Sequence, residues 1–241
     1  MKREWLILTA VAFCLGRAAA GPVPAGPMIS NLNHLWPGQS MGNFETVLPG
    51  YGYGFMFGTG ANPYSLDSVV FQELGGLGTV QVSLYAVQGD PLAGPNSNLI
   101  FAGTLGNPVI DPRPTQWPGY TSFIDYSPVN SITLAPDTYY LIAATEPVNG
   151  DDNTALTFNF NDTYDVAGDW TADQAVPSAW TYYGSQPPYS PFHGWMYDYT
   201  PGSIKVEVNA SPVPEPCSFA VLMLGCAFLS ARRLHRSGPK K

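Results

Sequence analysis

The chain has 241 residues and a formal net charge of −8. Residues 21–210 hold only Arg113 and Lys205 as basic side chains against sixteen acidic ones, a net charge of −14 by count. Such a surface repels nucleic acid phosphates and anionic lipid, which excludes nucleic acid as a partner. All three cysteines lie outside this range, so residues 21–210 contain neither a disulfide nor a thiolate metal site.

The first twenty residues have the three parts of a secretory signal peptide. A basic start precedes an apolar stretch over residues 5–15, and Ala18 and Ala20 form a small-residue cleavage pattern. We therefore expect residues 1–20 to be removed on export. Residues 21–210 would then form one exported domain.

Alternation of apolar and polar residues predicts β-strands through this domain. The clearest cases are residues 80–86 and 204–208, for which the period of two predicts one buried and one exposed face. No stretch of the domain has a helical period. We expect an all-β fold, an antiparallel β-sandwich of jelly-roll or immunoglobulin-like topology. Shorter strands are predicted at residues 66–71, 99–104, 120–124, 132–134, 139–143 and 156–160.

The segment of residues 50–58 alternates glycine with aromatic residues. It lacks the Lys-Ser/Thr ending of a phosphate-binding loop, and no helical pattern follows it. The alternation favours a strand at the start of the sheet, or a loop that packs beside it.

Acidic residues gather between residues 151 and 173. Carboxylates such as Asp162, Asp165 and Asp169 supply the hard oxygen ligands that Ca²⁺ prefers, although their spacing is not that of an EF-hand loop. They are candidate calcium ligands, and the alternative is that they are solvated loop carboxylates. No other cofactor is expected.

Aromatic residues crowd the region from Trp170 to Tyr199. Exposed rings beside acidic and amide groups can stack on sugar faces, which makes Trp180 and Trp195 candidate carbohydrate-binding residues. The alternative is that most of these rings pack in the core.

The sequence offers little for catalysis. His34 and His193 are the only histidines of the exported domain, and no Gly-x-Ser-x-Gly nucleophile motif occurs. We expect no enzyme activity. A hydrolase with paired carboxylates stays open as an alternative, because acidic residues are abundant.

The last part of the chain, residues 211–241, combines a polar motif, an apolar run and a basic end. Residues 216–231 are apolar enough to insert as a short transmembrane helix, and the cations that follow keep the C-terminus in the cytoplasm. The residues of the motif and of the arginine pair are Val213, Pro214, Glu215, Pro216, Arg232 and Arg233.

This arrangement resembles the PEP-CTERM sorting signal of bacterial exported proteins. The resemblance implies an exosortase-type membrane enzyme as partner, a membrane-anchored precursor, and a final place on the cell surface or in the extracellular matrix. Cys217 departs from the Ser or Thr that family members more often have there. Bacterial origin follows from the same resemblance.

The exported domain also resembles, more loosely, a β-sandwich module often called a choice-of-anchor domain. Residues 57–60, 64–69, 82–85 and 132–141 carry this likeness, which implies no catalytic residues. The sequence thus predicts a non-catalytic exported surface or matrix protein, associated with exopolysaccharide. The alternatives are a carbohydrate- or calcium-binding module and, after those, a hydrolase.

Overall fold

The computed structural model describes a β-sheet domain within residues 25–212. The chain divides by its internal contacts into this unit and a second one, residues 1–24 with 213–241. No helix occurs in the described parts, so none there is long and apolar enough to cross a bilayer. The expected signal peptide and the 216–231 helix lie outside the described residues. Those residues are 27–33, 43–47, 51–74, 80–89, 99–115, 120–146, 155–159, 164–172, 179–183, 194–197 and 203–213.

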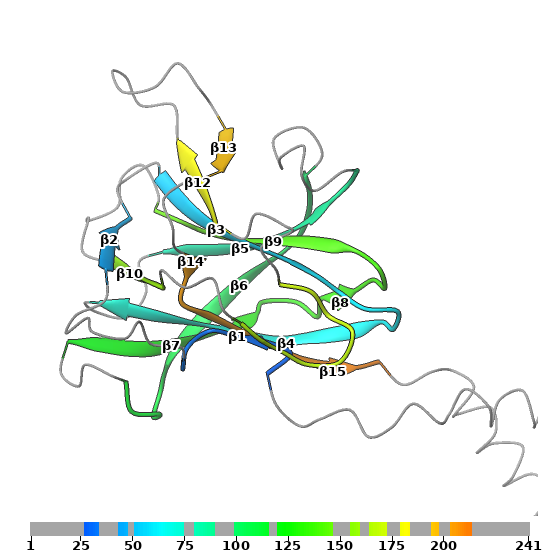
Figure 1. Ribbon diagram of the computed structural model, residues 1–241, viewed down its shortest axis with the longest axis horizontal. Coiled ribbons are helices and arrows are strands. Elements are labelled where there is room, and N and C mark those ends of the chain that lie inside the picture. The colour runs from blue at the N-terminus through cyan, green and yellow to red at the C-terminus, as the bar shows by residue number, and fades with distance from the viewer. Residues whose placement is uncertain are drawn as a thin grey trace, which may run out of the picture. The chain divides into compact units, whose positions relative to one another are not determined.

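Every pairing between the described strands is antiparallel, and the strands form one connected sheet (Figure 1). The predicted all-β, antiparallel class is therefore confirmed. The strands are β1 (Ile29–Ser30), β2 (Asn43–Thr46), β3 (Tyr51–Gly58), β4 (Tyr64–Leu74), β5 (Gln81–Val87), β6 (Leu99–Asp111), β7 (Thr121–Pro128), β8 (Thr133–Leu134), β9 (Tyr139–Thr145), β10 (Ala155–Asn159), β11 (Asp165–Val166), β12 (Ala179–Tyr183), β13 (Gly194–Tyr197), β14 (Ser203–Ile204) and β15 (Val206–Pro212).

The main path through the sheet is β11-β1-β15-β4-β7-β6-β5-β9-β3-β12-β13. Strand β6 connects the two halves of this path. Its residues up to Leu105 pair with β5, and its residues from Leu105 onward pair with β7. The second ladder shifts register between Gly106 and Val109, where Asn107 adopts a φ of 51°. A bulge of this kind bends a strand. In Figure 1, β6 accordingly runs diagonally between the β5–β9 group and the β4–β7 group.

The strands expected from alternation are present. Val82 and Leu84 of β5 are fully buried and Gln81 is exposed, as the period of two predicts. Ser83 departs from the pattern, since it is buried too, and Ala86 is only partly buried. The Gly-rich segment also forms a strand, but β3 does not lie at the side of the sheet. It pairs with β9 on one edge and β12 on the other. Its glycines allow close approach, since a Cβ on Gly52 would lie 2.8 Å from the carbonyl oxygen of Ala144.

The prediction that residues 204–208 have one exposed face is wrong. Val206 and Val208 are fully buried, but Lys205 and Glu207 are also buried, with exposed fractions of 2% and 3%. Pairing with β1 and β4 covers only the edges of β15. The side chain of Glu207 is buried because Arg113, which follows β6, lies against it. Both charged side chains are hydrogen-bonded: the Lys205 Nζ donates to the Leu32 carbonyl at 3.2 Å, and Glu207 accepts from Arg113.

Candidate functional site: an acidic pocket at the end of strand β3

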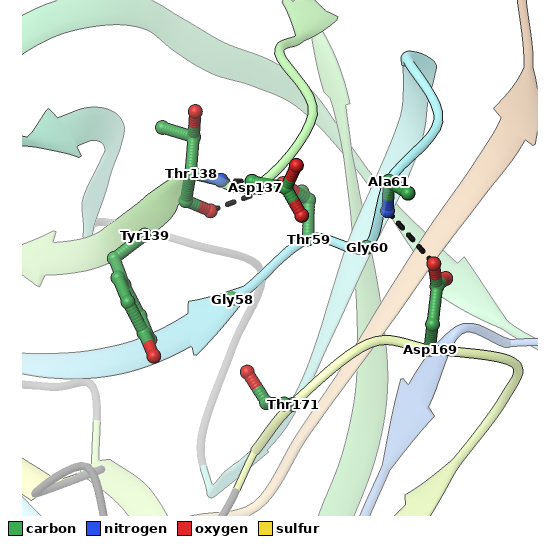
Figure 2. Close-up of a pocket in the computed structure, with 9 residues that line it drawn as sticks. All are labelled: Gly58, Thr59, Gly60, Ala61, Asp137, Thr138, Tyr139, Asp169 and Thr171. Carbon is green, nitrogen blue, oxygen red and sulfur yellow. Dashed lines mark hydrogen bonds between the residues drawn. The ribbon is translucent and has the colours of Figure 1, made fainter.

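A pocket of about 300 Å³ lies where three separate segments of the chain meet (Figure 2). The segments are the end of β3, the turn before β9, and the loop that follows β11. The lining residues are Gly58, Thr59, Gly60, Ala61, Asp137, Thr138, Tyr139, Asp169 and Thr171.

Two glycines at the end of β3 let the other segments approach. A Cβ on Gly58 would lie 2.4 Å from the Thr171 hydroxyl oxygen and 3.0 Å from the ring of Tyr139. A Cβ on Gly60 would lie 1.8 Å from a carboxylate oxygen of Asp169. Real Cβ atoms do not tolerate such distances, so a larger residue at either position would displace the side chains of Thr171, Tyr139 or Asp169 that line the pocket.

The turn before β9 is tied to the end of β3 by the side chain of Thr59. Its hydroxyl donates to the Ala135 carbonyl at 2.7 Å and accepts the N–H of Thr138 at 3.0 Å. The Asp137 N–H donates to the Gly60 carbonyl at 2.9 Å. Asp137 itself has a φ of 48°, a left-handed conformation that Asp tolerates better than most residues. This places its exposed carboxylate at the pocket (Figure 2).

The third segment carries Asp169 and Thr171. The Ala61 N–H donates to the Asp169 carboxylate at 2.7 Å, and Gly58 and Thr171 exchange backbone hydrogen bonds of 2.8 and 2.9 Å. Figure 2 shows Asp169 beside Gly60 and Ala61, with Thr171 beside Gly58. One Asp169 oxygen is thus engaged, and the other is available.

Each of the three segments has one buried aromatic residue next to its pocket residues. Phe57 precedes Gly58, Tyr140 follows Tyr139, and Trp170 separates Asp169 from Thr171. The Phe57 ring stacks on Trp170 with centroids 5.6 Å apart and on Tyr140 with centroids 5.7 Å apart. Tyr140 also accepts the Ala135 N–H at 2.7 Å, and burial raises the pKa of its hydroxyl. A site whose supporting residues are locked by packing is preorganised.

The pocket offers acceptors for hydrogen bonds and one aromatic ring. Asp137, the free oxygen of Asp169 and the Thr171 hydroxyl can all accept, and a carboxylate can only accept. Tyr139 packs against the hydrophobic cluster of Met56, Val87, Leu141 and Ala143. None of the described residues that line the pocket is basic. It therefore suits a ligand that donates hydrogen bonds.

The calcium candidates do not come together in the described residues. Asp169 lines the pocket, whereas Asp165 lies on β11, paired with Ser30, and is not part of the lining. Asp162 lies outside the described residues. Within the described part of the chain, no group of three or more metal-ligating side chains is present.

The two carbohydrate candidates lie on neighbouring strands. Trp180 on β12 pairs with Tyr197 on β13, and Tyr182 pairs with Trp195. Directly paired residues share a face, and residues two apart on a strand share it too, so these four aromatic positions occupy one face of the ladder. On the adjacent strand β3 their partners on that face are Gly54 and Gly52. By contrast, Trp170 of the same aromatic region is buried in the core, with an exposed fraction of 3%.

Sequence reasoning missed the pocket as a unit. From the sequence, Asp169 is a candidate calcium ligand, and Asp137 falls within residues 132–141, which carry only the likeness to the β-sandwich module. A recoverable clue was the repeated pairing of an aromatic residue with small polar neighbours, at 57–60, 137–140 and 169–171.

The sorting and cleavage residues stand apart from this site. Val213 is described but forms no strand, and the remaining motif residues from Pro214 onward, like Ala18 and Ala20, lie outside the described residues. A scan against models of known protein families finds no match, and no curated protein matches the chain.

Proposed function

We propose that this protein is a non-catalytic exported protein, delivered by its signal peptide and held by a PEP-CTERM-type tail to the cell surface or extracellular matrix. Its partners are an exosortase-type enzyme, the membrane through residues 216–231, and extracellular polysaccharide. We assign its body to the jelly-roll type of β-sandwich, supported by the corner that β6 makes between two groups of strands.

The observation that carries the proposal is how the sheet holds the strand next to the tail. Strand β15 ends at Pro212, immediately before the motif at 213–216. It pairs with β4 along its length and with β1 at Glu207 and Val208, near its start. Ladder hydrogen bonds are perpendicular to the strands, so tension from the tail would load many of them together. An anchored domain benefits from this arrangement, because the ladder between β15 and β4 extends along all seven residues of β15, up to the start of the tail.

A side-chain pair reinforces the same strand. Glu207 of β15 accepts hydrogen bonds of 3.0 and 2.8 Å from Arg113, which follows β6, and one of 3.2 Å from Ser30 of β1. The strand that leads to the tail is therefore tied to two other segments by a nearly buried carboxylate.

Processing in a bacterium that has an exosortase-type system tests the proposal. The surface form should be lighter than the membrane precursor by a C-terminal fragment, as measured by mass spectrometry. The triple variant Pro214→Ala, Glu215→Gln, Pro216→Ala should accumulate as the precursor. Equal masses in both fractions, or normal processing of the variant, would contradict it.

Carbohydrate binding by the β12–β13 ladder is a second candidate function, favoured by the register that gathers four aromatic positions on one face. Polysaccharide pull-down should weaken on Trp180→Ala and on Trp195→Ala. The matched control is Tyr120→Ala, which removes an exposed ring that lies next to β7 and away from both candidate sites. Retention by all three variants equal to that of the unaltered protein would reject this function.

A further inference from the structure

We propose that the pocket at the end of β3 binds a sugar unit that carries a free ammonium group, as in a de-N-acetylated amino-sugar polysaccharide. The binding itself is independent of sorting. That the ligand is met outside the cell rests on the proposed function.

The charge of the pocket selects the ligand. Asp137 and Asp169 contribute two carboxylates, and the lining contains no basic side chain in the part of the chain that the structure describes. The only cations of residues 21–210 are engaged elsewhere, Arg113 with Glu207 and Asp111, and Lys205 with the Leu32 carbonyl. A ligand ammonium would supply the missing positive charge, and the acidic domain would attract it from a distance.

The hydrogen-bonding groups select donors. At Asp169 one oxygen holds the Ala61 N–H, and none of the described residues donates to the carboxylate of Asp137. Ammonium and hydroxyl groups can donate to both aspartates, and bonds between charged partners are the strong ones. A uronic acid would instead bring a third carboxylate into the same space.

Size and shape select a small unit. A volume of about 300 Å³ is at the lower end of the range for ligand pockets, so one sugar or the end of a chain fits. The partly buried Tyr139 ring offers an apolar wall for the C–H face of the sugar, and its packing on Met56 and Leu141 holds it in place.

Binding is measured by calorimetry on the purified full-length chain in mild detergent. Four probes are compared at one ionic strength: the β-linked disaccharide of glucosamine, its di-N-acetylated form, a disaccharide of glucuronic acid, and CaCl₂ alone. We expect the free amine to bind at least about tenfold more tightly than either other sugar, as loss of a charge-assisted bond implies.

Two variants remove charge with little change of structure. Asp169→Asn keeps an oxygen to accept the Ala61 N–H, and Asn tolerates the φ of 48° at Asp137→Asn. Each should weaken binding of the amine about tenfold. The matched control is Asp67→Asn, an exposed aspartate that bonds Ser211 away from the pocket and loses the same charge.

Each other outcome overturns the proposal. Equal binding of the free amine and its acetylated form would indicate a site for neutral sugar. Calcium binding that depends on Asp169 would indicate a cation site. Equal weakening by Asp67→Asn would indicate general attraction to an acidic surface, and no binding of any probe would show that the pocket takes none of them. None of these results bears on the processing of the tail, so the two proposals fail separately.

Discussion

Arg113 donates hydrogen bonds to the carboxylate of Glu207 from both terminal nitrogens, at 3.0 and 2.8 Å. The two side chains differ in exposure, 42% for Arg113 and 4% for Glu207. The same guanidinium lies 2.7 Å from Asp111. Burial raises the pKa of Asp111, but the hydrogen bonds from Arg113 outweigh it and leave that pKa below its usual value.

Replacing this arginine should destabilise the domain. Arg113→Gln leaves the buried Glu207 carboxylate without its cation, and we expect the free energy of unfolding to fall by about 2 kcal/mol. This is less than for a fully buried pair, because water reaches Arg113. Urea denaturation measures the change. Arg113→Lys keeps the charge but not the paired geometry, so its free energy of unfolding should lie between those of the unaltered protein and Arg113→Gln. An unchanged urea midpoint for Arg113→Gln would show that the pair contributes nothing to stability.

Stability should depend on pH through Lys205. Burial lowers its pKa from 10.5 to about 8. Because the folded pKa is the lower one, the unfolded chain binds the proton more tightly, and the cost of burying the charge is present in full below pH 8. That cost declines as the pH rises from 8 toward 10.5, so stability rises.

The comparison with Lys205→Met isolates this effect. Between pH 7.5 and 9.5 the free energy of unfolding of the unaltered protein should rise by about 2 kcal/mol relative to the variant. Measurements stop at pH 9.5, before tyrosines of the unfolded chain ionise. Parallel pH profiles for the two proteins would show that folding leaves the Lys205 pKa at its ordinary value, and would contradict the shift.

The hydrogen bond between Tyr126 and Glu73 should contribute to stability. The Tyr126 hydroxyl donates to Glu73 at 2.7 Å, and both residues are buried. Burial, with the nearby Glu73 charge, holds the tyrosine pKa above its usual value, so the hydroxyl keeps its proton. Tyr126→Phe should cost about 1–3 kcal/mol in chemical denaturation. Tyr120→Phe removes the same atom from a side chain that is 72% exposed and should be neutral.

The contact between Gly60 and Asp169 should give a non-additive pair of substitutions. Gly60→Ala places a methyl group where the Asp169 carboxylate lies. That exposed side chain must turn away and lose its bond to the Ala61 N–H, at a cost of about 0.5–1.5 kcal/mol. Asp169→Ala alone removes the bond to the Ala61 N–H. In the double variant the added methyl meets no carboxylate, so Gly60→Ala should cost much less in that background. Full additivity of the two losses would mean that the side chains do not meet.

Local patterns were enough to predict the strands but not the surroundings of each strand. Alternation identified β5 and the β14–β15 region, because the period of two is a property of one strand by itself. The same reasoning placed Lys205 and Glu207 in water. It could not foresee that Arg113, some ninety residues earlier, supplies a cation to the inner side of β15.

For the candidate pocket, too, the sequence indicated individual residues but not their meeting in space. Residues 57–60 and 132–141 stood out in the sequence, and Asp169 stood out as an acid. Their meeting depends on Phe57, Tyr140 and Trp170 packing together across the sheet. Spacing along the chain does not encode such contacts between distant segments.

By itself the sequence determined an all-β antiparallel class and a strongly acidic domain, because strand periodicity and charge are local properties of the chain. It also motivates the export and sorting hypothesis through the composition of its two ends. Only the tertiary structure decided that both cations of the domain are engaged around β15 and that two aspartates share one pocket. Those outcomes depend on which distant strands become neighbours, and that is settled by packing of the whole sheet.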